Sequence, residues 1–102
     1  MPLPVDAAER KRIPLHSGVM AYFPDALIEV ARISWAGNEQ HNPGQPLHWA
    51  RAKSTDHEDC IARHTYDAMV SDGHERIKHL ASRAWRALAA LQLAVEDAED
   101  KL

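Results

Sequence analysis

The sequence predicts an all-α domain built from three helices. Apolar residues recur at helical spacing in three segments, no segment alternates apolar and polar residues over a useful length, and β-branched residues are few. A chain of 102 residues is expected to form one domain with a thin core. Prolines and charged residues near the start predict an N-terminal arm over residues 1–21, with one short turn at Asp6–Arg12, followed by the helical domain over residues 22–102.

The first helix is expected over residues 24–36. Pro24 suits the first helical position, and Asp25 places a carboxylate in the first turn, where it interacts favourably with the helix dipole. One face carries residues at helical spacing, namely Leu27, Val30, Ala31 and Ser34. Gly37 is expected to end this helix, because glycine favours the left-handed conformation that often follows a last turn.

The segment Gly37–Lys53 has neither helical nor strand periodicity and is expected to form a long ordered loop between the first two helices. Loops of this length are uncommon in small domains and tend to be functional or disordered. Its composition differs from that of flexible linkers, because carboxamides and an aromatic ring can bind a flat heterocycle and cations can bind phosphate. The candidate ligand-binding residues here are Asn38, Gln40, His41, Asn42, Trp49, Arg51 and Lys53. The alternative is an ordered connector closed by Pro43-Gly44 and Pro46.

The second and third helices are expected over residues 55–70 and 74–98. Each opens with a capping-box pattern, Thr55-x-x-Glu58 in one and Asp72-x-x-Glu75 in the other. The third helix carries a continuous apolar stripe, widened by Trp85, that comprises Ile77, Leu80, Ala81, Ala84, Leu88, Leu91 and Val95. Two other short helices cannot cover this stripe, so we expect a homodimer or homotetramer to complete the bundle.

Acidic and imidazole side chains concentrate on the second helix and at the start of the third. Residues spaced i, i+3 share a helix face, and the short turn between these helices is expected to bring Asp67 close to Asp72 and His79. Such groups facing one another across helices hold Mg²⁺ or Mn²⁺ in helical bundles. The candidate metal ligands are Asp56, Asp59, His64, Asp67, Asp72 and His79.

Each of these groups also has a purely structural explanation. Asp72 and Glu75 could serve only as helix caps, and Asp59 with Arg63 could form a surface ion pair of small energetic weight. An inward-facing His64 could be a hydrogen-bonded core histidine.

Composition excludes several classes of protein. A net charge of −3 and a pI near 6.1 argue against binding nucleic acid through charge, and no apolar run approaches the length of a membrane span. The single cysteine, Cys60, indicates a reducing compartment and a place in the core, and the N-terminus lacks the apolar centre of a secretory signal. We therefore expect a cytoplasmic protein with neither a membrane partner nor direct nucleic-acid binding.

Several motifs resemble those of a known family. They are GNEQHNPGQPLHWARAKS over residues 37–54, DHEDC over 56–60, Arg63-His64, Asp67, Asp72-Gly73 and AWRALAALQ over 84–92. Together they resemble the phage dATP/dGTP diphosphohydrolase N-terminal family, a branch of the MazG-like all-α nucleotide pyrophosphohydrolases. The resemblance covers about residues 22–96.

The resemblance implies a MazG-like bundle that hydrolyses a purine deoxynucleoside triphosphate, dGTP or dATP, to the monophosphate and pyrophosphate. It implies Mg²⁺ or Mn²⁺ as cofactor, a homodimer or homotetramer, and in some phages a role in making a 2-aminoadenine genome, in the host cytoplasm. The resulting hypothesis gives catalytic roles to Asp59, Asp67, Lys53 and Arg63 and adds Arg86 to the substrate-binding residues.

One feature departs from the family pattern. MazG-like enzymes typically bind metal through Glu-x-x-Glu on one helix and Glu-x-x-Asp on the next. In this sequence, Asp56-x-x-Asp59 is the closest match to the first motif, and Asp72 and His79 could replace the second. A non-catalytic nucleotide-binding module and a helical interaction module are the alternative functions.

Overall fold

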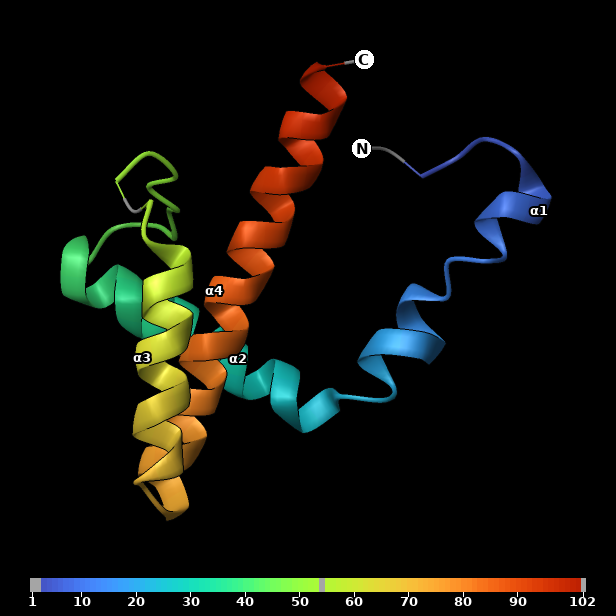
Figure 1. Cartoon of the computed structure of the whole chain (residues 1–102). Coiled ribbons are helices and arrows are strands. Elements are labelled where there is room, and N and C mark those ends of the chain that lie inside the picture. Colours follow the sequence, from blue (N-terminus) through green and yellow to red (C-terminus); the bar gives the residue numbers. More distant parts are fainter. Residues whose placement is uncertain (1–2, 54, 102) are drawn as a thin grey trace.

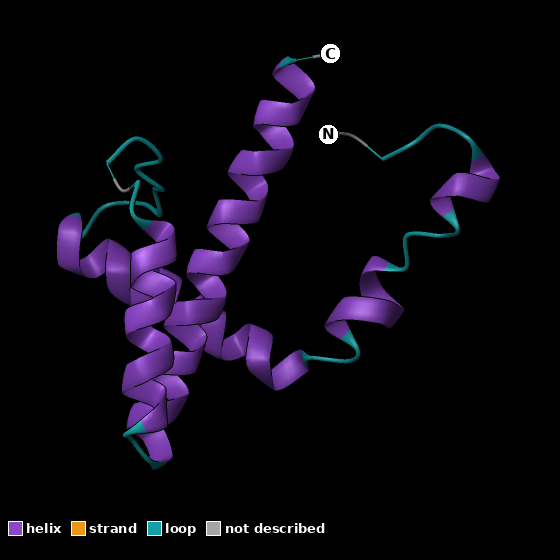
Figure 2. Cartoon of the chain, viewed as in Figure 1, coloured by secondary structure: helices purple, strands orange, loops and turns teal. Residues whose placement is uncertain are grey.

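The computed structural model describes residues 3–53 and 55–101, and these residues form helices and loops without any strand (Figures 1 and 2). The prediction of an all-α fold is therefore confirmed. In chain order the helices are α1 (Ala7–Arg10), a short π-helical turn η1 (His16–Met20), α2 (Pro24–His41), α3 (His57–Met69) and α4 (Gly73–Asp100). Among the same residues, no helix has both the length and the apolar composition needed to cross a membrane.

Helices α3 and α4 form an antiparallel hairpin, and α2 packs across α4 (Figure 1). The turn between α3 and α4 is tight, and Gly73 occupies it with a φ of 55°, a left-handed conformation that glycine adopts without steric cost. Small side chains allow the two helices to approach each other closely. The buried apolar residues are Cys60 and Ala68 on α3 and Ala81 and Ala89 on α4.

Helix α2 is longer than the sequence predicts. It continues past Gly37 to His41, with Asn42 at its C-terminal end, and Gly37 does not adopt a positive φ. An internal glycine costs about 1 kcal/mol relative to alanine, but the additional turn carries Asn38, which is buried and bonded to the following loop. This tertiary contact outweighs the preference of glycine, and the loop is correspondingly shorter than the predicted Gly37–Lys53.

The side-chain hydrogen bonds of the two predicted capping boxes do not form. Helix α3 begins at His57 with Asp56 at its N-cap, and α4 begins at Gly73 with Asp72 at its N-cap, and neither cap side chain bonds to the first turn. The predicted boundaries of both helices nevertheless lie within two residues of the observed ones. In the arm, by contrast, the Asp6 carboxylate accepts from the Glu9 backbone N–H at 3.0 Å and caps α1 within the predicted turn.

The fold is open and leaves much apolar surface in contact with solvent. Its radius of gyration is 15.9 Å, whereas a compact domain of about 100 residues is expected at about 13 Å. The arm stands away from the α2–α4 body, and the C-terminal half of α4 projects beyond α3 (Figure 1). None of the large side chains in the described residues is fully buried, and Leu88 and Leu91 on α4 are 52% and 61% exposed. Within the described part of the chain, the apolar core of a single copy therefore consists of small residues.

Candidate functional site

One cavity of about 910 Å³ lies where the C-terminal part of α2, the loop after it, the start of α3 and the middle of α4 meet. Its wall includes most of the polar residues that the sequence analysis selected as ligand-binding. These are Asn38, Gln40, His41 and Asn42 from the end of α2, Trp49 and Lys53 from the loop, and Arg86 from α4. The structure therefore brings together groups that are up to 48 positions apart in the sequence, Asn38 and Arg86.

Asn38 holds the loop in place at the base of this cavity. Its side-chain amide donates from Nδ2 to the Gln45 carbonyl at 2.9 Å, and its Oδ1 accepts from the His48 backbone N–H at 3.1 Å. The residue is 6% exposed. Because both ends of the amide bond to the loop backbone, Asn38 acts on the shape of the cavity, while the exposed Gln40 and His41 are better placed to bind a ligand.

We expect Asn38→Ala to lower the melting temperature. The substitution leaves the Gln45 carbonyl and the His48 N–H without their partner, and each of these partly buried hydrogen bonds contributes about 0.5–1.5 kcal/mol. For a domain of this size, each kcal/mol corresponds to a shift of about 4–8 °C. Asn42→Ala is the matched control, because Asn42 lies on the same wall and its removal keeps both bonds. Equal melting temperatures for Asn38→Ala and the unmodified protein would show that these bonds do not hold the loop.

Two tryptophans anchor the loop to α4. The rings of Trp49 and Trp85 meet edge to face, with centroids 5.9 Å apart, and both line the cavity. The Arg51 guanidinium lies over the Trp49 ring, 4.3 Å from its centroid. Trp49 is thus held by contacts with the Arg51 cation and with the Trp85 ring of α4.

Arg51 is not on the cavity wall, although the sequence analysis gave it a phosphate-binding role. Its Nη1 donates to both carboxylate oxygens of Glu96 on α4, at 2.5 and 2.6 Å. Arg51, followed by Gln92, holds the pKa of the Glu96 carboxyl below its usual value. Arg51 therefore serves as a link between the loop and α4.

His57 is a residue of the cavity wall that the sequence analysis missed. It is 8% exposed, its Nδ1 lies 3.3 Å from Arg86 Nη1, and its Nε2 is the buried side-chain atom of the described residues that lacks a hydrogen-bond partner. Since the guanidinium can only donate, Nδ1 accepts and the proton resides on Nε2. The sequence does indicate that His57 points inward. It lies one turn before Cys60, Ile61 and His64, which form the inward face of α3.

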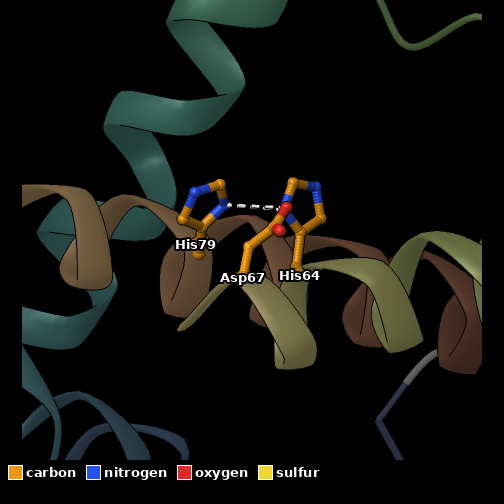
Figure 3. A group of neighbouring side chains, drawn as sticks. All are labelled: His64, Asp67 and His79. Carbon is orange, nitrogen blue, oxygen red and sulfur yellow. Dashed lines mark hydrogen bonds and ion pairs between the residues drawn. The ribbon is translucent and has the colours of Figure 1, made fainter. Parts of the chain in front are cut away.

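Three of the predicted metal ligands form a compact group beside the cavity. His64 and Asp67 come from α3 and His79 from α4, and their side chains point toward one another (Figure 3). His64 Nδ1 and His79 Nδ1 are 3.1 Å apart, and Asp67 Oδ2 lies 3.9 Å from His79 Nδ1. His64 also lines the cavity, so the group is adjacent to the space that a ligand would occupy.

The surroundings of His64 favour its neutral form. Burial and, after it, the proximity of His79 lower the pKa of His64. The neutral imidazole, which is the form that coordinates metals, is therefore favoured at His64 near neutral pH.

The structure does not bring the other predicted ligands into this group. Asp56 and Asp59 lie at the start of α3, beside a second hollow, and Asp72 lies at the start of α4. At a rise of about 1.5 Å per residue, Asp59 and Asp56 are about 7 and 12 Å from His64 along the helix axis. Asp56 and Asp59 are therefore too far along α3 to join the group of His64, Asp67 and His79.

Arg63 is also turned away from the cavity. Its Nη2 contacts Asp56 Oδ2 at 3.4 Å and Cys60 Sγ at 3.1 Å, and the bond to Asp56 raises the pKa of the Arg63 guanidinium. The structural alternative for Arg63 was an ion pair with Asp59, and the structure shows an ion pair with Asp56. Neither Asp59 nor Arg63 is among the described residues that line the cavity.

No protein-family model, curated protein or solved structure matches this chain. The resemblance to the dATP/dGTP diphosphohydrolase family therefore stays a prediction from the sequence motifs.

Proposed function

We propose that this protein hydrolyses a purine deoxynucleoside triphosphate, dGTP or dATP, to the monophosphate and pyrophosphate with the help of a divalent metal ion. One observation supports this most directly. A single cavity carries an aromatic ring, carboxamides, two cations and one member of the His64, Asp67 and His79 group on its wall. Its volume of about 910 Å³ lies within the range of about 300–1,000 Å³ that is typical of ligand pockets.

Each class of group has a role in this proposal. Trp49 would stack on the purine, and Gln40 and Asn42 would hydrogen-bond to its edge. Lys53 and Arg86 would bind the triphosphate, with Arg86 placed by its contact with His57. Asn38, Arg51 and Glu96 would keep the loop in the conformation that presents these groups.

The reaction requires an attacking water and a stabilised leaving group. Water adds to the α-phosphorus, the bond between this phosphorus and the bridging oxygen breaks, and pyrophosphate leaves. Asp67 is the residue that we assign to accept the proton from water. A bound divalent ion would neutralise charge on the phosphate oxygens, and Lys53 and Arg86 would hold the departing pyrophosphate.

Such an activity would remove dATP and supply dGMP in a phage whose genome contains 2-aminoadenine. It would take place in the host cytoplasm if the chain is phage-encoded.

The test is a screen for pyrophosphate release from all common ribo- and deoxynucleoside triphosphates, with Mg²⁺ and Mn²⁺ supplied separately. The proposal predicts release from dGTP or dATP with a metal and none with a chelator. Thermal stabilisation by a nucleotide without turnover would instead favour a nucleotide sensor. If the nucleotides are not hydrolysed and do not stabilise the protein, an interaction module would be the better description.

We also propose that the protein is a two-fold dimer or a dimer of dimers, and we expect light scattering at micromolar concentration to show this. Leu88 and Leu91 form part of an apolar face on α4 that the described residues leave exposed. The double substitution Leu88→Asp with Leu91→Asp should give a monomer. Lys101→Glu changes the net charge by the same amount at the C-terminal cap of α4 and should leave the mass of the assembly unaltered. A monomeric mass for the unmodified chain would contradict the proposal.

A further inference from the structure

We propose that His64, Asp67 and His79 form a binding site that selects a transition-metal ion such as Mn²⁺, Co²⁺ or Zn²⁺ over Mg²⁺. This metal site is part of the proposed function. Only the role of the metal in turnover depends on that function. Metal binding itself is measured without nucleotide.

The spacing of the two imidazole nitrogens agrees with coordination of one ion, and the Asp67 oxygen lies farther away, 3.9 Å from His79 Nδ1. One nitrogen or oxygen atom from each of the three side chains lies within 4.8 Å of the others, and the two Nδ1 atoms are 3.1 Å apart. Metal–nitrogen bonds of about 2.0–2.1 Å place two neighbouring ligand nitrogens about 2.9–3.4 Å apart, for angles between a right angle and the tetrahedral one. The two imidazoles therefore already have the separation that a shared ion requires.

The position of the group in the fold supports the same conclusion. His64 and Asp67 are one turn apart on α3 and face His79 on α4 (Figure 3), so two packed helices fix the three side chains relative to one another. His79 Nε2 lies 4.0 Å from Glu75 Oε2, one turn earlier on α4. Metal-binding histidines commonly direct their second nitrogen to a carboxylate, and Glu75 is the nearby carboxylate here, although 4.0 Å is longer than a hydrogen bond.

The donor atoms decide between the metals. Mg²⁺ prefers oxygen ligands and is usually held by one or two carboxylates together with substrate phosphates. Here Asp67 supplies the only carboxylate of the described three-residue group, and the other two donors are imidazole nitrogens, which suit later transition metals. The Mg²⁺ that the family resemblance implies therefore fits this group poorly, whereas Mn²⁺, Co²⁺ and Zn²⁺ accept both kinds of donor.

The test is calorimetric titration of the untagged full-length chain with Co²⁺, Zn²⁺, Mn²⁺ and Mg²⁺ without nucleotide, together with the visible absorption of bound Co²⁺. We expect one Co²⁺ or Zn²⁺ per chain and a dissociation constant at least about 100-fold below that for Mg²⁺. His64→Ala and His79→Ala should each weaken Co²⁺ binding by about 100-fold and alter its absorption spectrum. His74→Ala, which removes an exposed histidine from the first turn of α4, should leave both measurements unchanged.

Circular dichroism of each metal-free variant first establishes that it is folded. Folded His64→Ala and His79→Ala proteins that bind Co²⁺ as tightly as the unmodified chain would overturn the inference, and would leave the contact between the two imidazoles as a hydrogen bond. Equal affinity for Mg²⁺ and Co²⁺ would overturn it too. Tight Co²⁺ binding that both substitutions abolish, without nucleotide hydrolysis in any metal, would support the metal site and remove the proposed function.

Discussion

Replacing Lys53 by alanine is expected to lower kcat for dGTP or dATP by about 100-fold or more, with a smaller change in KM. Lys53 is exposed at the end of the loop and lines the cavity close to the start of α3. Charge on the departing pyrophosphate increases as the bond to the α-phosphorus breaks, so a cation placed there stabilises the transition state more than the bound substrate. Removing a comparable donor from a preorganised site costs about 100- to 1,000-fold in kcat.

Steady-state kinetics on three proteins test this expectation. Lys53→Arg retains the charge and should keep more activity than Lys53→Ala. Lys78→Ala removes an exposed lysine of α4 that is not among the described residues of the cavity wall, and should behave like the unmodified protein. If Lys53→Ala increases KM alone, the lysine binds substrate and transition state equally and has no special role in turnover.

The helices could be predicted because their signals are local. The spacing of apolar residues and the predicted breaks at residues 37–53 and 71–73 indicate three helices without knowledge of the fold, and these correspond to α2, α3 and α4. The end of α2 could not be predicted in this way. Asn38 contacts Gln45 and His48, which lie seven and ten residues later, and this contact extends the helix past a glycine that by itself favours termination.

The grouping of the loop residues was easier to predict than the contacts of each residue. The loop was selected for its aromatic ring, carboxamides and cations, and Trp49 and Lys53 do line one cavity. Arg51 has the same chemistry as its neighbours, but its partner Glu96 lies 45 positions away, so the sequence does not reveal that the charge is already engaged. His57 was not predicted, because the apolar positions of α3 are sparse and mark its inward face only weakly in the first turn.

Helix geometry explains why only part of the predicted metal group assembles. The acids were selected because many of them lie on α3. Residues that follow one another along a helix are, however, distributed over its length. Only His64 and Asp67, one turn apart and level with His79 on α4, are brought together. Ligands from two helices meet only where they lie at the same height along the helix pair. A sequence shows which residues do so only where the turn between the helices is short.

Replacing Trp49 by alanine is expected to raise KM for the purine nucleotide by about 5- to 150-fold with little change in kcat. Stacking of a base on an aromatic side chain contributes about 1–3 kcal/mol, and this contribution is lost equally from the bound substrate and the transition state. Trp49 also contacts Trp85 and Arg51, so the substitution should lower the melting temperature as well.

Two further variants separate binding from stability. Trp49→Phe keeps an aromatic ring on the cavity wall and should recover most of the affinity. Trp35→Ala removes a tryptophan of α2 that is 62% exposed and is not among the described residues of the cavity wall, and should leave KM unchanged. A Trp49→Ala protein with a lowered melting temperature but normal kinetic constants would show that the ring only supports the loop. If Lys53→Ala also retains normal constants, the loop is a scaffold and the nucleotide must bind elsewhere.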